Sequence, residues 1–564
     1  MREWPLAAAF FAAVALLFTA DGFRPHHVML PLDLPRDAGA WKIDPNQRVV
    51  VSNKLLSDAV LEFHAWDIEV RRDLARGEFP WRNRFAGNGA HLFANPESGL
   101  LFPLTWLRIA MRDRGWTIWI FIKLWLAGLG MWWLARAMTG CGFRAALLSG
   151  FVYATCGYMT AWLLSPHTTV FAMLPWLAAA CLTDRIGAVV VTAALAAAAG
   201  HPETLFYGVT AIALYLGRRI SRATIVAAFL GFAICAVQLV PFAYALAKSD
   251  LLAQRAHRPT HLRLFAIPAT ILPGFLGTPL GSEIDLSGIA QPAAENFAER
   301  SGGYAGAVVL LMLIAAWRSL PRRAIVIGIA ALVISWIPPG FFPGASERLG
   351  LVFCFFAAAC AGVAFENYRR AGVIVAIVAG VAALVALFIA TPFAQPLLTR
   401  AARSGIAMLQ QRNYLRLPGA IYEARLTHYL AGFQAVAIRR LAIPLLCIAV
   451  AAFTRRRAVV AAAIAVEMIA FAYGYTPIID TKQIAPAAPA IADVLRLDPE
   501  HRFLIAAAPE VYPPNLGTAD GVRDIRSYDV LQSHGRIEML KRLGYDPVDR
   551  SFPDVPPPQL ARLG

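Results

Sequence analysis

The sequence has few charged residues, and none of its seven cysteines lies in a long polar stretch. Only 16% of the 564 residues are charged, whereas 58% are hydrophobic. Six cysteines fall in apolar segments and the seventh, Cys141, in a short turn, which excludes a disulfide framework and a CxxC zinc site. No GK[ST] loop for nucleotide phosphates occurs. This composition does not fit a set of water-soluble domains.

Long apolar runs take the place of soluble domains. Runs such as Ala223–Ala247 and Ala371–Thr391 exceed the roughly 20 residues that cross a bilayer. The segment Leu6–Phe18 resembles a signal peptide, but no clear cleavage site follows it, so we interpret it as the first span. The sequence therefore predicts an all-α polytopic membrane protein with about 13 transmembrane helices. The other expected spans are Trp116–Ala135, Ala145–Leu164, Thr168–Leu182, Ile186–Ala199, Thr204–Gly217, Ala305–Trp317, Ala324–Ile337, Leu349–Phe365, Leu441–Phe453 and Ala458–Gly474.

The net charge of +16 comes mainly from one set of short loops. With a cytoplasmic N-terminus, the six inside loops hold fourteen basic and two acidic residues, while the short outside connections hold no Lys or Arg. This is the positive-inside pattern, so a nucleic-acid partner is unnecessary. The inside loops are Arg136–Arg144, Asp184–Arg185, Arg218–Arg222, Arg318–Arg323, Glu366–Arg370 and Thr454–Arg457.

Two parts of the chain differ in composition. Residues 1–476 form the expected transmembrane domain, with extracytoplasmic loops over 21–115, 248–304 and 392–440. Residues 477–564 form a small extracytoplasmic α/β segment with a short strand after Arg502. Its thin core predicts that the segment is either incomplete or leans on the membrane part. We expect the N-terminus to be cytoplasmic, with the large loops and the C-terminus outside.

The stretch Leu55–Asn83 in the first loop predicts an amphipathic helix. Its apolar residues recur at steps of three and four, and Ser57 is the expected N-cap. Asp58 and Glu62 then lie one turn apart and are candidates for a catalytic base, with His64 a candidate for substrate binding. The alternative is a surface helix with ordinary solvated charges.

A second candidate is the short outside connection Gly200-His201-Pro202-Glu203-Thr204. It brings an imidazole and a carboxylate into a tight reversal between two helices, on the same side as the first loop. The alternative interpretation is a simple capped turn. We take His201 and Glu203 as candidates for substrate binding.

The second and later outside loops add basic and acidic candidates. The cluster Arg255, His257, Arg258 and His261 suits phosphate contact, although such a cluster is also typical of a patch facing solvent or lipid headgroups. The remaining candidates are Glu299, Arg300, Tyr304 and Arg348. Two further charged residues, Lys123 and Glu467, fall within expected spans, where an internal ion pair or a side chain reaching the interface explains them.

Several short motifs occur in a fixed order along almost the whole chain. Each is weak alone, but together their order and spacing are fairly specific. They are Asp58-x-x-x-Glu62-Phe63, Gly77-x-x-Pro80-Trp81-x-Asn83, Gly87-Asn88-Gly89, Asn95-Pro96-Glu97-Ser98, Phe102-Pro103, the Gly200 connection, Glu299 with Tyr304 and Gly306, Pro514-Asn515, and Asp524-x-Arg526-Ser527-Tyr528-Asp529.

This set resembles the YfhO-like family of bacterial membrane proteins, which is related to the GT-C glycosyltransferases. Glu62, Phe63 and Ser527 depart from the family's usual Gln, Tyr and Gly. The resemblance implies a GT-C-like fold and an enzyme that transfers a sugar from a polyprenyl-phosphate donor to a glycan or lipid acceptor of the cell envelope. It makes Asp58 the expected general base, with Glu62 second, and Arg300, Arg348, His201 and the Arg255 cluster the expected phosphate contacts. By singling out Asp58 it leaves Glu62, Asp67, Glu69 and Asp73 as acids expected to be solvated. It also implies that the enzyme works at the outer face of the bacterial inner membrane.

No cofactor is expected beyond the lipid-linked donor, and no ligand spacing demands a divalent metal, although the resemblance leaves one open. Two other classes of function stay open: a lipid or glycan transporter without chemistry, and a non-catalytic envelope assembly protein. A transporter would be expected to show paired halves with corresponding broken helices, and the sequence has no internal repeat.

Overall fold

The computed structural model describes residues 3–42, 49–87, 89–252, 261–262, 264–281, 296–339, 345–368, 391–411, 419–484, 488–498, 504–505, 511–529 and 531–546, with the single residues 380, 384, 388 and 509. This part of the chain is mainly helical, and its strands are two residues long each. The expected span Ala371–Thr391 lies largely outside the described residues.

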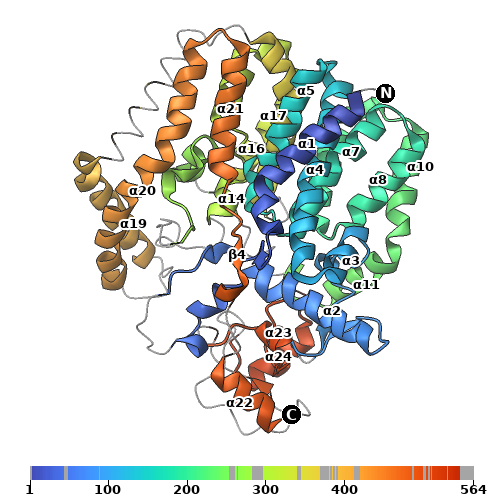
Figure 1. The fold of residues 1–564 in the computed structure, drawn as a ribbon, viewed down its shortest axis with the longest axis vertical. Helices are drawn as coiled ribbons and strands as arrows, with labels where there is room; N and C mark the ends of the chain where they lie inside the picture. The colour runs from blue at the N-terminus through green and yellow to red at the C-terminus, as the bar shows by residue number, and fades with distance from the viewer. Residues whose placement is uncertain are drawn as a thin grey trace.

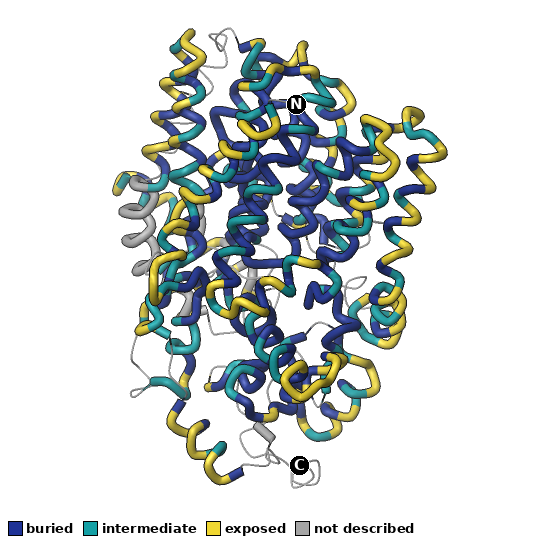
Figure 2. Tube along the Cα trace, turned by 45° about the vertical axis from the view of Figure 1, so that its right-hand side comes forward, coloured by how far each residue is buried: buried dark blue, intermediate teal, exposed yellow. Residues whose placement is uncertain are grey.

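Apolar helices form a bundle that fills the upper part of Figure 1. A continuous core of buried side chains runs through the middle of this bundle (Figure 2). Helix α4 is central, because α1, α5, α7 and α17 all pack against it. The bundle contains α1 (Glu3–Thr19), α4 (Arg112–Thr139), α5 (Phe143–Thr155), α6 (Gly157–Ala161), α7 (Pro166–Leu182), α8 (Ile186–Ala198), α9 (Pro202–Leu216), α10 (Arg222–Ile234), α11 (Ala236–Ala247), α15 (Ala307–Ala315), α16 (Arg322–Trp336), α17 (Gly350–Asn367), α20 (Gly419–Phe453) and α21 (Arg457–Ala472).

Three helical stretches of the described chain are long and apolar enough to cross a membrane. A fourth is the pair α10 and α11, which passes only if the two helices are taken together and which bends by 72° at its break. The three stretches are Glu3–Phe23, Arg112–Thr139 and Ser346–Asn367. Other apolar helices are shorter, so the expected number of 13 spans stays a prediction.

Several expected boundaries differ from the structure. The expected span Ala145–Leu164 is interrupted at Cys156, whose extended backbone separates α5 from α6. The third expected loop is helical where it is described, in α19 (Gln395–Gln411) and α20. Helix α20 continues through Arg440 into the following apolar segment and contains Pro444 within it.

The loops that the charge pattern places inside meet at one end of the bundle, at the top of Figure 1. Arg136 forms an ion pair with Glu3. The carboxylate of Glu366 accepts a 2.8 Å hydrogen bond from the backbone N–H of Gly142, and Arg457 donates to the backbone carbonyl of Glu366. We call this the basic end. The structure thus brings together loops that the charge count groups on one side.

The first loop and the C-terminal segment form a layer at the opposite end, at the bottom of Figure 1. Strand β1 (His27–Val28) pairs antiparallel with β4 (Ile479–Asp480), which joins the two parts. The other first-loop elements are η1 (Ala20–Phe23), η2 (Leu34–Asp37), η3 (Gly39–Trp41), η4 (Lys54–Leu56), η5 (Ala59–His64), α2 (Ala65–Ala75), β2 (Arg82–Asn83), β3 (Ala90–His91), η6 (Pro96–Ser98) and α3 (Pro103–Ala110).

The described C-terminal segment packs against the rest of the protein. Its strand β5 (Leu504–Ile505), near the expected position, pairs in parallel with β6 (Arg523–Asp524), and Tyr512 and Leu516 belong to the main buried core. The remaining elements are η14 (Thr481–Gln483), α22 (Pro489–Leu497), α23 (Leu516–Asp520) and α24 (His534–Arg542). Within the first loop, β2 pairs antiparallel with β3. The connecting elements elsewhere are η7 (Gly217–Arg219), η8 (Leu264–Thr270), η9 (Pro273–Leu276), α14 (Phe297–Ser301), η11 (Trp317–Ser319), η12 (Ser346–Leu349) and η13 (Pro392–Ala394).

Candidate functional site

The amphipathic helix of the first loop exists, but it starts earlier than the sequence predicts. Asn53 is the N-cap, because its side chain accepts the N–H of Leu55, and Ser57 already has helical backbone angles. The expected cap at Ser57 is therefore wrong. The helix then widens into the π-helix η5 before it continues as α2. Such π segments are uncommon in proteins, and those that occur often lie at functional sites.

The acids expected to be solvated on this helix are buried. Asp67 forms a buried ion pair with Arg108, with N–O distances of 2.7 and 2.9 Å. Asp73 accepts hydrogen bonds from Arg76 and Arg84 at 2.5 and 2.7 Å. The prediction is wrong because these arginines neutralise the carboxylates within a packed layer.

Glu69 is buried among the same arginines. Its carboxylate lies 3.6–3.8 Å from the guanidinium groups of Arg72, Arg76 and Arg84. Burial, together with the nearby charge of Asp73, raises the pKa of Glu69. Glu69 is therefore enclosed by protein and is not accessible to a substrate.

Asp58 differs from these acids because its side chain is only partly buried. Its Oδ1 accepts a 2.8 Å hydrogen bond from the hydroxyl of Tyr528 in the C-terminal segment. Glu62, one turn away, is buried within the π-helix. Burial lowers the pKa of His64, although the carboxylate of Asp67 acts in the opposite direction. Asp58 is thus the partly exposed carboxylate of this helix.

The residues around Tyr528 form a polar network. The Asn515 side chain accepts the backbone N–H of Tyr528 at 2.9 Å and donates to Oδ1 of Asp529 at 3.2 Å. Ser527 donates to the other oxygen of Asp529 at 2.7 Å. We call Asp58, Tyr528, Asn515 and Asp529 the Asp58 centre. It unites the Asp58 motif of the first loop with two neighbouring motifs of the C-terminal segment, which contain Asn515 and Tyr528.

The first loop holds this network in place. The backbone N–H of Gly87 lies 2.9 Å from the carbonyl oxygens of both Asp524 and Arg526. Gly87 has a φ of 60°, and an added Cβ would lie 2.6 Å from the guanidinium of Arg536, so glycine fits both the turn and the contact. Asp524 and Arg526 form a fully buried ion pair at 2.7 Å.

The connection at Gly200 is a capped turn, and it is also part of a larger cluster. His201 is the N-cap of α9, and its Nδ1 accepts the N–H of Thr204 at 3.1 Å. Gly200 has a φ of 99°, and a Cβ there would lie 2.6 Å from the carbonyl oxygen of Pro96 and 3.5 Å from Cβ of Pro166. Three turns from different parts of the chain therefore meet at this glycine.

These turns share one sequence pattern, a capping residue followed by Pro and then His or Glu. In each turn the capping side chain accepts a backbone N–H, and proline occupies the first helical position. We call them the turn cluster: Asn95-Pro96-Glu97, Ser165-Pro166-His167 and His201-Pro202-Glu203. The pattern is visible in the sequence, but from the sequence alone candidates for substrate binding are predicted only in the third turn.

Aromatic stacking and one acid complete the cluster on the histidine side. The imidazole rings of His167 and His201 stack with centroids 3.5 Å apart, and the ring of Trp162 stacks on His167 at 4.4 Å. Oε1 of Glu97 lies 3.8 Å from Nε2 of His201. The sequence interpretation missed His167, Trp162 and Glu97 as members of this site.

Arg348 occupies the carboxylate side of the cluster. Its guanidinium contacts Glu203 at 2.8 Å and Glu299 at 3.6 Å, and Glu347 is buried next to it in the chain. Burial raises the pKa of Glu299 in α14 to about 8; the charge of Arg348 opposes this rise. The pKa of Glu299 therefore lies well above that of an ordinary carboxyl group.

The other expected residues have separate places. Arg300 is fully buried and donates to the carbonyl of Gly277 at 2.9 Å. Tyr304 is buried and donates to Glu467 at 2.6 Å, which explains how one charged residue of an expected span is held. His261 is exposed. Arg255, His257 and Arg258, like Asn88 of the first loop, lie outside the described residues.

Lys123, the second charged residue of an expected span, lies beneath the turn cluster. Its ammonium donates to the carbonyls of Leu163 and Ser165 at 2.7 and 3.2 Å and to the hydroxyl of Thr168 at 3.0 Å. It also lies 3.3 Å from the ring centroid of Trp119. Lys123 therefore provides hydrogen-bond donors to the segment between α6 and α7, just before His167.

A chain of contacts runs from the helix of Asp58 to α14, which carries Glu299 beside Arg348. The side chain of Asn53, which caps the helix of Asp58, donates to the carbonyl of Tyr475 at 3.0 Å. The ring of Tyr475 stacks on Phe297, which begins α14 and is two residues from Glu299. The Asp58 centre and the turn cluster thus belong to one layer.

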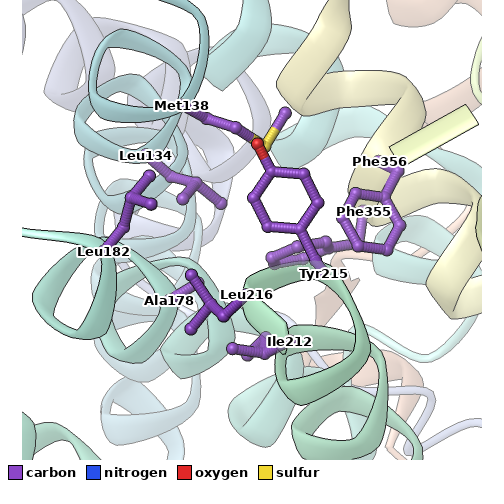
Figure 3. A pocket seen from close by; sticks show the side chains of 9 residues that line it. All are labelled: Leu134, Met138, Ala178, Leu182, Ile212, Tyr215, Leu216, Phe355 and Phe356. Atoms are coloured by element: carbon purple, nitrogen blue, oxygen red, sulfur yellow. The ribbon is translucent and has the colours of Figure 1, made fainter. Parts of the chain in front are cut away.

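The described residues contain no group of three or more His, Cys, Asp or Glu arranged to hold a metal ion. An apolar pocket lies elsewhere, near the basic end, and Figure 3 shows the side chains that line it. It is separate from the site because the C-terminal parts of α4, α7 and α9, together with Phe355 and Phe356 of α17, form it, whereas the turn cluster lies at the N-terminal ends of α7 and α9. Its lining residues are Leu134, Met138, Ala178, Leu182, Ile212, Tyr215, Leu216, Phe355 and Phe356.

No protein-family model and no curated protein matches the chain. Among solved structures, the chain is similar to ArnT from Cupriavidus metallidurans. For the crystal structure in the apo state the TM-score is 0.47 at 14% identity, with 97% of this chain and 89% of that chain covered. For the structure bound to undecaprenyl phosphate the TM-score is 0.44 at 16% identity, with 95% and 91% covered.

Proposed function

We propose that the protein is a membrane glycosyltransferase of the GT-C type, which transfers a sugar from a polyprenyl-phosphate donor to an acceptor of the cell envelope. The observation that carries the proposal is the partial exposure of Asp58 together with its hydrogen bond from Tyr528. Four other acids of its helix are buried, whereas Asp58 keeps an exposed portion and is held by a phenol. A general base needs such access to the acceptor hydroxyl.

The motifs of the resemblance support the same assignment. Asp58, Asn515 and Tyr528 come from separate motifs and meet in one network. Asn83 of the first-loop motif hydrogen-bonds Thr518 at 2.9 Å, in the same segment. In this proposal Asp58 removes the proton of the acceptor hydroxyl, the hydroxyl oxygen forms the new bond to the anomeric carbon, and the lipid phosphate leaves with the bonding electrons.

The turn cluster is the proposed place of the donor headgroup. Helices α7 and α9 begin there, and helix N-termini favour phosphate oxygens. His201 and Arg300 stay candidates for phosphate contact. Arg348 is less suited to it, because its guanidinium is already paired with the carboxylate of Glu203 at 2.8 Å. The sugar and the acceptor class beyond an envelope glycan or lipid follow from the resemblance alone.

The test is transfer from a labelled polyprenyl-phosphate sugar by purified protein in nanodiscs. We expect Asp58→Asn to lower kcat by about 100-fold or more, the usual contribution of a general base. Glu62→Gln is the second variant, and Asp493→Asn, at an exposed position in α22, is the matched control. Full activity of a folded Asp58→Asn variant would remove Asp58 from the mechanism.

A transporter is the second candidate function, because the 72° bend between α10 and α11 is typical of discontinuous transporter helices. The same variant separates the two functions. A transporter without chemistry keeps its flux when Asp58 loses its charge, and it moves lipid-linked cargo without producing a transferred sugar.

A further inference from the structure

Helix α11 has an apolar face that no other described element covers. Ile234, just before the bend, and Val237, Val240 and Tyr244 recur at three- and four-residue steps, and each exposes between 59% and 67% of its surface. The helix contains no charged residue. A contiguous apolar face of this kind marks a contact surface rather than a water-facing one.

The opposite side of α11 is tied to the protein. Gln238 is almost fully buried, and its amide donates a 2.9 Å hydrogen bond to the carbonyl of Phe93 in the first loop. Just after α11, the carbonyl of Lys248 accepts the N–H of His534 at 2.9 Å, and Ser249 bridges to Ser533 of the C-terminal segment. The orientation of the helix is therefore fixed from both ends.

The depth of α11 follows from helix geometry. The 13 residues of α10 rise about 20 Å, and α11 at 72° to it adds only about 6 Å more along the same direction. The sum stays below the roughly 30 Å of a hydrocarbon core. Because the exposed apolar residues of α10, such as Val226 and Phe229, continue into those of α11, both helices face the same medium.

An aromatic group of the first loop adjoins the Gln238 side of α11. Phe79, Trp81 and Phe93 pack edge to face or tilted, with ring centroids 4.6–5.2 Å apart, and Trp81 is largely exposed. Phe93 is the residue whose carbonyl binds Gln238. Tryptophan and tyrosine are enriched where a membrane meets water.

We propose that α11 is an interfacial helix embedded in the membrane leaflet next to the site, with Ile234, Val237, Val240 and Tyr244 in contact with phospholipid acyl chains. The Phe79–Trp81–Phe93 group sits at the headgroup level above it. Through Gln238 the helix sets the height of the segment Phe93–Glu97, and so the place of Glu97 beside His201. This inference does not depend on the proposed enzymatic activity.

Spin-label accessibility tests the occupant directly. A nitroxide is attached to Val240→Cys in protein reconstituted at one copy per nanodisc, and its relaxation by oxygen and by a nickel chelate is measured. Lipid contact predicts high oxygen and low nickel accessibility. High nickel accessibility would mean that the face lies in water, and low values for both would mean that protein covers it; either result overturns the proposal.

Glu538→Cys, on the exposed side chain of α24, is the matched control and should be accessible to the nickel chelate. The seven native cysteines are buried or partly buried, so the signal of labelled wild-type protein is subtracted. The link to the site is tested separately with Gln238→Leu. We expect several-fold faster amide exchange at residues 93–99 and no change in α24; equal exchange in both proteins would remove the link.

Discussion

The hydroxyl of Tyr528 donates a hydrogen bond of 2.8 Å to Oδ1 of Asp58, across 470 positions of the sequence. The contact joins the first loop to the C-terminal segment. It also orients the carboxylate that we assign as the general base.

Tyr528→Phe is expected to lower kcat about tenfold and to leave KM nearly unchanged. The change removes one hydrogen bond, worth about 0.5–1.5 kcal/mol, but keeps the ring. Steady-state kinetics with the labelled donor measure it. The reduction must be smaller than that of Asp58→Asn; an unchanged kcat would show that the phenol does not orient the base.

Arg72→Met is expected to loosen the C-terminal segment. The guanidinium of Arg72 donates to the carbonyls of Thr518 and Ala519, the latter at 2.9 Å, and it also faces the buried Glu69. Without it, α23 loses its tie to α2, and proteases should cleave residues 511–546 faster than in the wild type. Arg496→Met, at an exposed ion pair, is the control and should be cleaved at the wild-type rate.

Lys123→Met is expected to destabilise the protein and to disturb His167. Each buried carbonyl left without a donor costs about 1–3 kcal/mol, and the ammonium serves the carbonyls of Leu163 and Ser165. A thermal shift assay should show a lower Tm, whereas Lys541→Met in an exposed ion pair should not change it. An unchanged Tm for both variants would contradict the role of Lys123.

Glu299 is expected to make the stability of the protein fall as pH rises. Burial raises its pKa to about 8 from an ordinary value of 4.5, so between these values the folded state binds more protons than the unfolded state. Its contribution to the free energy of unfolding is therefore largest below 4.5 and decreases up to about 8. Denaturant titrations of Glu299→Gln should show a flatter pH dependence over this window; an unchanged slope would exclude Glu299 as its source.

The sequence supports part of this fold because apolar runs, basic loops and helix-capping residues are local signals. The charge count groups Arg136, Glu366 and Arg457, and the structure brings their loops together. The apolar periodicity of the first-loop helix can also be recognised in the sequence. The π-helix after Asp58 was not, because a change of helical pitch leaves no repeating pattern in a single sequence.

The burial of the acids could not be predicted for a related reason. Asp67 is neutralised by Arg108, 41 positions away, and such a partner is visible only after folding. The turn cluster is a different case. Its shared pattern of cap, proline and His or Glu occurs three times in the sequence, but only His201-Pro202-Glu203 is predicted to bind substrate, because no local signal shows that the three turns meet.

The pairing of β1 with β4 sets the order in which the protein can be completed. His27 meets Asp480 only after nearly the whole chain has been made, which takes roughly 20–90 s at usual rates of synthesis. During that time the first loop is already formed while its C-terminal partner is still unmade. The layer that holds Asp58 is therefore the last to close, and the Asp58 centre cannot be complete until the C-terminal segment has been made.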